Sequence, residues 1–393
     1  MAALPPGCQA PSASRSSEPR PSTFPSKKDT AAVKPQTFFS STYAEARRRF
    51  REAHDAAGAR LESHECPAKG PEGEPLTTDV AWLGPADAAQ VLVTISATHG
   101  VEGFCGSGVQ LGWLESGLAA EMPGDVALMQ IHAINPHGFA WLRRVTEDNV
   151  DLNRNFIDHD EPHPVNPGYQ ELAEVICPRE WNDSIIAETA LILDNYAEAH
   201  GPKALQKAIS GGQYSHADGI FFGGAKRTWS ANLLVSLLEK HLAQAKRVAV
   251  IDYHTGLGPR GHGERICIHE PDSAGLARAG AWYDDDITSP ALGTSASVEL
   301  FGFNVAGMET ALAHTELTAI ALEFGTQPST LVRQSLRADN WLHLHGELAS
   351  PKGRAIKRDI RDAFYQDQDD WKEMIFERSV ETQKMALAGL AQG

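Results

Sequence analysis

Cysteine is scarce in this 393-residue sequence, and its few copies do not form a disulfide framework. The five cysteines are odd in number, widely spaced and without a C-x-x-C pair: Cys8, Cys66, Cys105, Cys177 and Cys267. This usage also argues against a cysteine zinc site and fits a reducing compartment. Apolar runs of the roughly 20 residues that cross a bilayer are lacking, and the N-terminus has no compact apolar core of a secretory signal. We therefore expect a cytoplasmic protein.

Basic residues are in the minority. The sequence has 35 Lys and Arg against 51 Asp and Glu, with a formal net charge of -16. Because binding to nucleic-acid phosphates or anionic membranes needs a surplus of Lys and Arg, we expect neither as a partner. The G-x-S-x-G elbow of serine hydrolases is absent as well, and Cys105 has no evident base, so a serine or thiol hydrolase is disfavoured.

The chain is predicted to form one α/β domain with two extensions. Residues 1–36 are rich in Pro, Ser and Ala and are expected to form a disordered N-terminal tail. Residues 37–350 are the expected catalytic domain, and 351–393 a C-terminal helical extension. Apolar runs alternate with helical patterns, which predicts a largely parallel, helix-covered sheet. We expect strands at 78–83, 91–96, 126–134, 247–253 and 316–324, and helices at 37–64, 106–116, 181–200, 201–209 and 230–245.

Several of these strands end at residues that suit a metal site. The run 91–96 leads into His99 and Glu102, a His-x-x-Glu pair whose side chains can reach one ion. The run 247–253 is followed by His254, and 316–324 contains Glu323. Ligand sites of open α/β sheets lie outside the carboxyl ends of their strands. The His-x-x-Glu pair alone is also compatible with a solvated loop, and Glu323 alone with a structural carboxylate.

Taken together, the strand ends provide the residue set of a catalytic zinc site. Three protein ligands leave a fourth position open for water. A carboxylate that is not a ligand can take a proton from that water and pass it to a leaving amine. Glu323 is the candidate for this role. The polar loop after the strand at 126–134 adds Asp151, Asn153 and Arg154 to the site.

These motifs resemble those of the zinc carboxypeptidase superfamily. The matching segments are H99-G-V-E102, N135-P-H-G138, V150-D-L-N-R-N-F156, D252-Y-H-T255 and A321-L-E-F-G325. They occur in the family's order and cover roughly residues 81–344. The sequence looks most similar to an uncharacterised branch related to the succinylglutamate desuccinylase and aspartoacylase group. The resemblance implies a mixed, largely parallel eight-stranded sheet between helices.

The resemblance also implies roles for individual residues. One zinc ion per chain would be bound by His99, Glu102 and His254, with Glu323 as general base and acid. Asn153 and Arg154 would hold the substrate carboxylate, and Asp151 would accept a hydrogen bond from the free ring nitrogen of His99. Two further roles stay open: either Arg143 or Arg144 would stabilise the oxyanion, and Tyr214 could contribute a hydroxyl to the substrate or could simply be a packed aromatic residue.

One departure from the family pattern concerns tyrosine. Classical carboxypeptidases carry a tyrosine shortly before the catalytic glutamate, whereas no tyrosine lies between Tyr283 and Glu323 here. The leading hypothesis is a zinc hydrolase that cleaves an amide bond next to a free carboxylate, in a short peptide or a small molecule. The alternatives are an N-acyl amino acid deacylase of the aspartoacylase type and a non-catalytic binding protein on the same fold. No oligomeric state is inferred.

Overall fold

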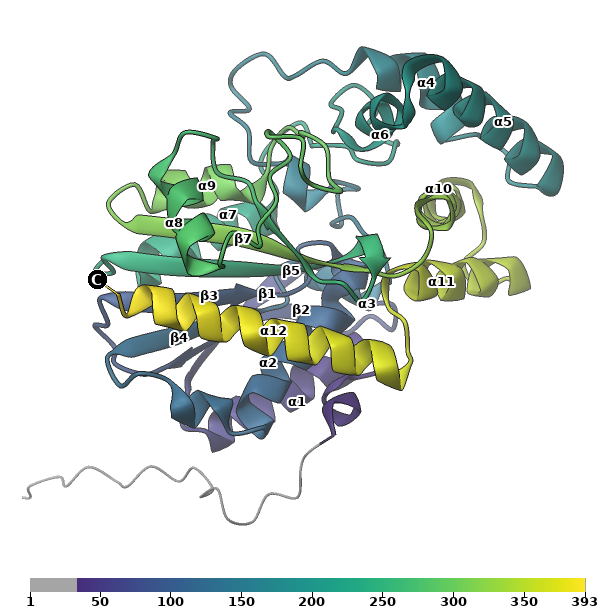
Figure 1. Cartoon of the computed structure of the whole chain (residues 1–393). Helices are drawn as coiled ribbons and strands as arrows, with labels where there is room; N and C mark the ends of the chain where they lie inside the picture. Colours follow the sequence, from purple (N-terminus) through teal and green to yellow (C-terminus); the bar gives the residue numbers. More distant parts are fainter. Residues whose placement is uncertain (1–33, 393) are drawn as a thin grey trace, which may run out of the picture.

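The computed structural model describes residues 34–392, which contain a seven-stranded sheet in the order β1-β2-β4-β3-β5-β7-β6 (Figure 1). The predicted N-terminal tail lies outside the described residues except for 34–36, and Pro35 already begins a short 3-10 helix. The strands are β1 (Arg60–Lys69), β2 (Pro75–Leu83), β3 (Gln90–Ile95), β4 (Val126–His132), β5 (Arg247–Arg260), β6 (Glu264–Cys267) and β7 (Glu316–Gly325).

The sheet is mixed, with a parallel centre. Strands β4, β3, β5 and β7 run parallel to one another, whereas the pairings of β1 with β2, β2 with β4 and β6 with β7 are antiparallel. The α/β class is therefore confirmed, but the described sheet has seven strands where eight were expected. Beside the edge strand β6, the following chain forms only one isolated bridge, Ile266 with Thr288, and does not extend into a further strand.

Helices precede β1, follow β7 and fill the connections β3–β4, β4–β5 and β6–β7. The α-helices are α1 (Tyr43–Ala56), α2 (Gly103–Glu115), α3 (Pro136–Ala140), α4 (Pro167–Ile176), α5 (Asp183–His200), α6 (Pro202–Ser210), α7 (Trp229–His241), α8 (Ala274–Trp282), α9 (Asn304–Ala311), α10 (Ser329–His345), α11 (Pro351–Phe364) and α12 (Asp369–Leu390). The 3-10 helices are η1 (Pro35–Phe38), η2 (Gly100–Glu102), η3 (Leu118–Glu121) and η4 (Leu152–Arg154).

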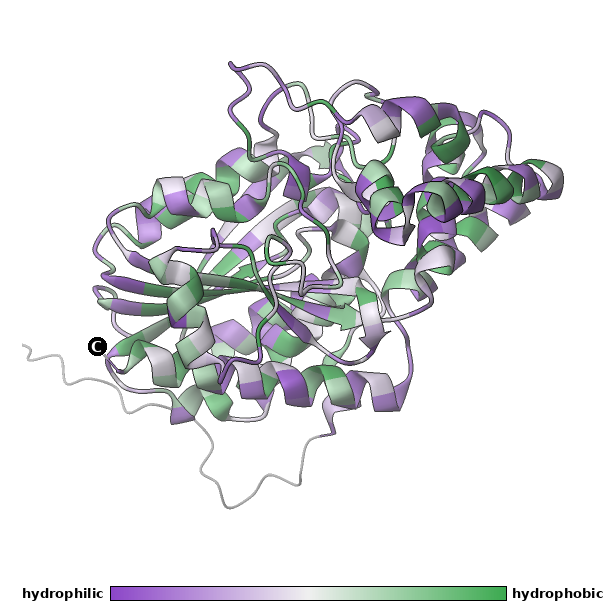
Figure 2. Cartoon of the chain, turned by 45° about the horizontal axis from the view of Figure 1, so that its top comes forward, coloured by the Kyte–Doolittle hydropathy of each residue, from purple (hydrophilic) through white to green (hydrophobic). Residues whose placement is uncertain are grey.

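The two faces of the sheet bury separate apolar clusters because successive side chains of a strand point to opposite sides. On β3, Leu92 packs with α2 and α12, whereas Val91 and Val93 pack on the other face with α7 and α9. Figure 1 shows α12 lying along the sheet, and Figure 2 shows the central strands as a largely hydrophobic layer. The segment 351–393 thus provides α11 and then α12, which covers one face of the core.

The helix expected over 37–64 is wrong at its C-terminal end. Thr42 caps α1, its hydroxyl accepting from the amide of Glu45 at 3.1 Å. The helix then stops at Ala56, because Gly58 adopts a left-handed φ of 73° that turns the chain. Residues from Arg60 onward instead form β1, which pairs with β2.

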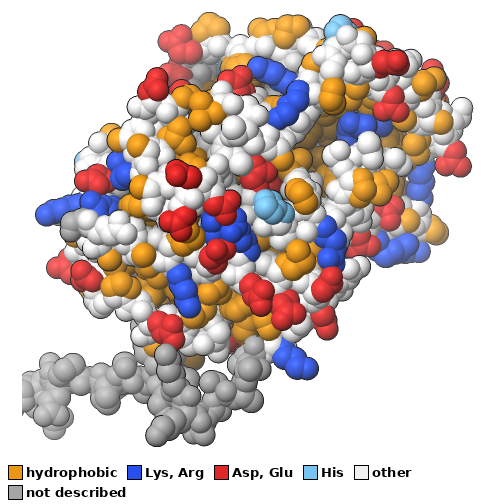
Figure 3. Space-filling model, viewed as in Figure 1, with side chains coloured by type: hydrophobic (Ala, Val, Ile, Leu, Met, Phe, Trp, Pro, Cys, Tyr) orange, Lys and Arg blue, Asp and Glu red, His pale blue; other side chains and the backbone are white. Residues whose placement is uncertain are grey.

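The surface carries charges of both signs. Figure 3 shows acidic and basic side chains interspersed over the viewed face. Within residues 34–392, none of the helices combines the length and the apolar character required to span a bilayer.

Candidate metal centre and active site

Two neighbouring chain segments deliver the expected ligands to one edge of the sheet, and a third brings Glu323 beside them. After β3, His99 precedes η2, and Glu102 ends that 3-10 helix at the start of α2. The turn is tight because a Cβ on Gly100 would lie 2.2 Å from the Cα of Gly138, so only glycine fits there. His254 lies on β5, in register with Glu323 on the parallel strand β7.

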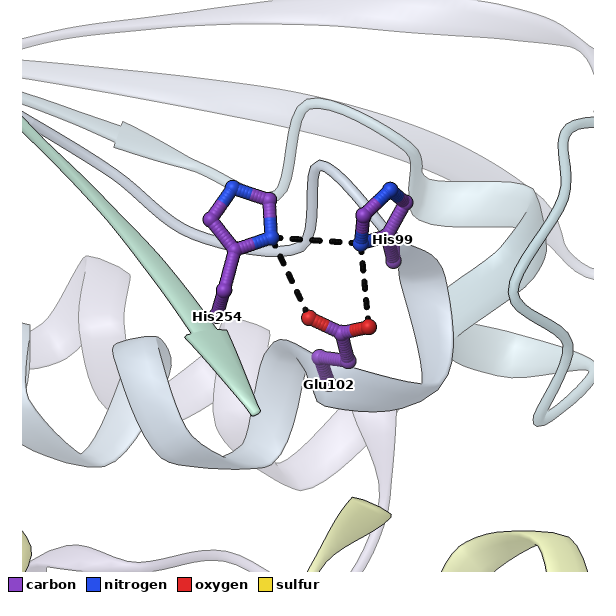
Figure 4. Close-up of side chains that lie close together, drawn as sticks. All are labelled: His99, Glu102 and His254. Carbon is purple, nitrogen blue, oxygen red and sulfur yellow. Dashed lines mark hydrogen bonds and ion pairs between the residues drawn. The ribbon is translucent and has the colours of Figure 1, made fainter. Parts of the chain in front are cut away.

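The side chains of His99, Glu102 and His254 point toward one another (Figure 4). His99 Nδ1 is 2.9 Å from Glu102 Oε1 and 3.1 Å from His254 Nδ1, and His254 Nδ1 is 3.3 Å from Glu102 Oε2. All three residues are buried. Ligand atoms bound to one tetrahedral Zn²⁺ at 2.0–2.2 Å are separated by about 3.3 Å. The triangle therefore has the size that a zinc site requires.

On each imidazole, the ring nitrogen that faces away from the triangle contacts a carboxylate, which supports a zinc site. His254 Nε2 donates to Asp252 Oδ2 at 2.8 Å, so Nδ1 is the ring nitrogen that faces the triangle and that a metal ion would bind. His99 Nε2 lies 3.2 Å from Asp151 Oδ1 and 2.8 Å from Arg144 Nη2. A guanidinium nitrogen can only donate, so His99 Nε2 accepts from Arg144 in this arrangement and the ring proton lies on Nδ1, toward Glu102. A metal ion bound at Nδ1 would require the proton on Nε2, which also faces Asp151. The Nδ1 atoms of both histidines and the carboxylate of Glu102 converge on one point, and carboxylate–histidine pairs are typical of metal sites.

The pKa values of Glu102 and His254 also indicate that the triangle favours a bound positive charge. Burial would raise the pKa of Glu102, but the charge of His99 and hydrogen bonds from both histidines outweigh it and hold the pKa below the usual range. Burial would lower the pKa of His254, but the negative charge of Asp252 outweighs it and holds the pKa well above the usual range. Without a metal ion, the triangle is therefore stabilised by a proton, and metal binding would release it.

Glu323 lies beside the triangle without belonging to it. Its Oε1 accepts a hydrogen bond from the backbone amide of Leu257 at 2.9 Å, and its side chain lines the same cavity as His99 and His254. Burial raises the pKa of this carboxyl above its usual value, and the neighbouring charge of Glu102 raises it further. A buried carboxyl with a raised pKa is suited to accept and return protons near neutral pH.

The structure separates the two candidate arginines. Arg144 lines the cavity, where its Nη1 donates to Glu102 at 3.0 Å and its Nε to Asp151 at 2.8 Å. Arg143 instead donates to Asp339 at 3.3 Å and to Asn149 at 3.0 Å, on the other side of the loop. Arg144 therefore faces the cavity, whereas Arg143 is not among the described residues that line it.

Arg154 and Asn153 also line the cavity, at the end of η4. The Arg154 guanidinium donates to the carbonyl of Ser210 from Nε at 3.1 Å and Nη2 at 2.7 Å, and to the carbonyl of Asn153 from Nη1 at 2.7 Å. The Tyr214 hydroxyl donates to the carbonyl of Arg154 at 2.6 Å. Tyr214 thus supports the backbone of Arg154, and it is not among the described residues that line the cavity.

Sequence reasoning missed the residues that hold His254. The carboxylate of Asp252 accepts from Thr98 Oγ1 at 2.9 Å and from Asn304 Nδ2 at 2.6 Å, in addition to His254. Asp252 could have been found, because residues two apart on a strand share a face and Asp252 stands two before His254. Asn304 carries no such signal, since only the tertiary fold brings it there.

Comparisons with known proteins give one family and a set of similar folds. A search of curated protein sequences finds no match. Carboxypeptidase A from Helicoverpa armigera is similar, with 13% identity, coverage of 89% of this chain and 73% of that chain, and a TM-score of 0.48. Succinylglutamate desuccinylase from Chromobacterium violaceum has 14% identity, coverage of 81% and 74%, and a TM-score of 0.36. Murein-tripeptide amidase from Escherichia coli O157 has 15% identity, coverage of 73% and 90%, and a TM-score of 0.33.

The family match covers most of the sequence, including every candidate site residue. Residues 39–378 match the sequence model of a family described as protein of unknown function. The chain therefore belongs to this family, DUF2817.

Proposed function

We propose that the protein is a zinc-dependent hydrolase that cleaves an amide bond adjacent to a free carboxylate. The proposal rests on the residues that line one cavity. It is lined by the His99, Glu102 and His254 triangle, by the buried carboxyl Glu323, and by the guanidinium of Arg154. A metal site, a proton-transfer group and an anion-binding group within one cavity are the parts that such a reaction needs.

The triangle would hold one zinc ion through His99 Nδ1, His254 Nδ1 and the carboxylate of Glu102. When bound, zinc supplies a Lewis acid that polarises a carbonyl and makes water a stronger nucleophile near neutral pH. Asp252 and Asp151 orient the two imidazoles for this role from the opposite ring nitrogens.

The remaining residues of the site handle protons and charge. Glu323 accepts the proton of the attacking water and returns it to the nitrogen of the departing amine. Arg144 already has two carboxylate partners, Glu102 and Asp151, which fix its guanidinium at the cavity wall. From that position it stabilises the negative charge that develops on the carbonyl oxygen in the transition state.

Arg154 is suited to bind the substrate carboxylate. Of the five N–H groups of its guanidinium, three donate to backbone carbonyls, which leaves one on each terminal nitrogen. Two such groups form the fork that pairs with a carboxylate. Burial lowers the pKa of Arg154 to about 10, which still leaves the group charged at neutral pH. A buried cation whose hydrogen bonds all go to neutral carbonyls favours an anionic ligand.

A free carboxylate next to the cleaved amide occurs both in peptides with a free C-terminus and in N-acyl amino acids. Both classes should therefore be tested with zinc-loaded protein, as N-acylated dipeptides and N-acyl amino acids, each against its carboxamide. Glu323 and all three residues of the triangle are present in one cavity. This combination favours an enzyme over a binding protein on the same fold.

Glu323→Gln tests the mechanism. The amide keeps the size and the contact with the Leu257 amide but cannot shuttle a proton. Turnover should fall by roughly a hundredfold to ten-thousandfold, with zinc content unchanged. Glu316→Gln is the matched control, because Glu316 begins the same strand but is exposed and pairs with Arg247. Full turnover by the Glu323→Gln variant would show that this carboxylate is structural.

A further inference from the structure

The active-site cavity continues from Glu323 along an apolar part of the sheet. It has a volume of about 110 Å³, where roughly 10–15 Å³ suffices for one water molecule. Beyond the polar end, its walls include Ile266, Ile268, Leu300, Phe303 and Ala321. The cavity as a whole is therefore much larger than one water molecule, and this part of its wall offers mainly hydrocarbon contacts.

Strand alternation explains why this apolar wall adjoins the catalytic carboxyl. Ala321 lies two residues before Glu323 on β7, so both side chains are on the same face. Ile266 on β6 is the register partner of Ala321. The small side chain of Ala321 leaves space at this point of the cavity wall, and Ile266 and Ile268 form the neighbouring part.

Another part of the cavity wall is attached directly to the segment that carries Arg154. The amide of Phe156 donates to the carbonyl of Gly302 at 3.2 Å, and the amide of Asn304 donates to Asn153 Oδ1 at 2.9 Å. Leu300 and Phe303 belong to this same stretch, residues 295–304, which we call the wall segment. The wall segment therefore lies next to the segment whose Arg154 would pair with a substrate carboxylate.

The wall segment is held in place by buried and helical groups. Glu264 on β6 accepts from Ser295 Oγ at 2.8 Å and from the amide of Ala296 at 3.1 Å. From α6, Lys203 donates to the carbonyl of Ser295 at 2.8 Å and Gln206 to the carbonyl of Ala296 at 2.9 Å. The apolar wall is thus a fixed part of the site.

Among the described residues that line the cavity, no charged group is left to pair with a charged substrate side chain. Among the described residues that line it, the charged and titratable ones are His99, Glu102, Arg144, Arg154, His254 and Glu323. Each of these is assigned above to the metal site, to proton transfer or to the carboxylate and oxyanion. A second carboxylate or an ammonium group of the substrate would be desolvated against Ile266, Ile268 and Phe303 without a charged partner, which is unfavourable.

We propose that this site selects substrates whose side chain next to the free carboxylate is apolar, aliphatic or aromatic, over those with an acidic or basic side chain. The inference rests on the proposed function, because it uses Arg154 as the carboxylate site. It assigns specificity to Ile266, Ile268, Leu300, Phe303 and Ala321. Burial of one aliphatic side chain changes binding by about tenfold to a hundredfold, which sets the expected preference.

The first experiment compares N-acetyl-leucine, N-acetyl-phenylalanine, N-acetyl-aspartate and N-acetyl-lysine, and the N-acylated dipeptides that end in the same residues. kcat/KM is measured with the zinc-loaded protein, and calorimetry measures binding to the Glu323→Gln variant. Leucine and phenylalanine compounds should be favoured at least tenfold in both measurements. If none of the compounds is cleaved, the proposed function fails while binding still tests selectivity. Equal or tighter binding of the aspartate or lysine compound overturns the inference.

Two variants test the assigned residues. Ile268→Asp places a carboxylate at the partly buried position 268 and should shift the preference toward lysine by at least tenfold. Ala321→Leu fills the space beside position 321. It should lower kcat/KM for the phenylalanine compound at least tenfold more than for N-acetyl-alanine. Leu191→Glu is the control, because Leu191 is exposed on α5 and outside the cavity lining. Thermal unfolding checks that each variant is folded. An unchanged order of preference in a folded Ala321→Leu variant overturns the assignment, even if Ile268→Asp fails to fold.

Discussion

Replacing Arg154 by lysine keeps a positive charge in the cavity but removes the planar fork. In the native site, three N–H groups hold the guanidinium to the carbonyls of Ser210 and Asn153, and two remain for the substrate. A lysine ammonium has three donors around one atom and cannot make both sets of contacts. The substrate carboxylate is therefore expected to lose one charge-assisted hydrogen bond.

The size of the effect follows from that count. A hydrogen bond to a charged group contributes about 1.5–3 kcal/mol, which corresponds to about 10- to 150-fold in kcat/KM. The carbonyls of Ser210 and Asn153 also lose donors, and this costs a further 1–3 kcal/mol or so of folding stability. The two effects are separable, because the first depends on the substrate and the second does not.

The assay compares a free-acid substrate with its carboxamide. Arg154→Lys should reduce kcat/KM for the acid by the expected factor and change that of the carboxamide little, since the amide carries no charge to pair. Arg337→Lys is the matched control: Arg337 is a buried arginine that donates to the carbonyls of Ile176 and Val175, outside the cavity lining. Equal losses on the acid and the carboxamide would refute a role of Arg154 in carboxylate recognition.

Two further predictions concern the metal and the stability of the fold. His254→Ala should lose most of about one zinc per chain in elemental analysis, while the exposed His262→Ala should keep it; undiminished zinc in His254→Ala would exclude the proposed ligand set. Asp79 is buried and pairs with Arg47 at 2.7 Å and Arg51 at 2.6 Å. Burial would raise its pKa, but hydrogen bonds from Ser63 and Arg47 outweigh it and lower the pKa below 3.8. Its contribution is thus present above about pH 4 and is lost as the pH falls through the folded pKa. Asp79→Ala should lower the free energy of unfolding at pH 7 by about 1–3 kcal/mol, and the difference should shrink toward pH 3. A difference that does not depend on pH would contradict this origin.

The central strands and the metal triangle were accessible to sequence reasoning for one physical reason. Strands covered on both faces are continuous apolar runs, so 91–96 and 316–324 match β3 and β7 to within a residue. Polar residues that follow such runs must then meet at one edge of the sheet. Strand β1 lacked this signal, because it lies at the edge and mixes charged and apolar residues.

The choice between Arg143 and Arg144 could not be made from the sequence. Adjacent residues point in different directions, and their directions are set by distant partners. Asp339, the partner of Arg143, lies on α10 almost two hundred residues later, and Asp151, the partner of Arg144, lies in the same loop. The same holds for the apolar wall of the cavity, whose members come from β6, β7 and the wall segment.

Asn304 connects the parts of the site that the sequence presents separately. Its side chain donates to Asp252, which holds His254, and its backbone amide is bound by Asn153, the neighbour of Arg154. Asn304 also begins α9 directly after Phe303 of the wall segment. The metal triangle, the carboxylate site and the apolar wall are therefore fixed to one another through this buried amide. In the proposed reaction, the distance between the substrate's cleaved bond, its carboxylate and its side chain would consequently be set by these buried contacts.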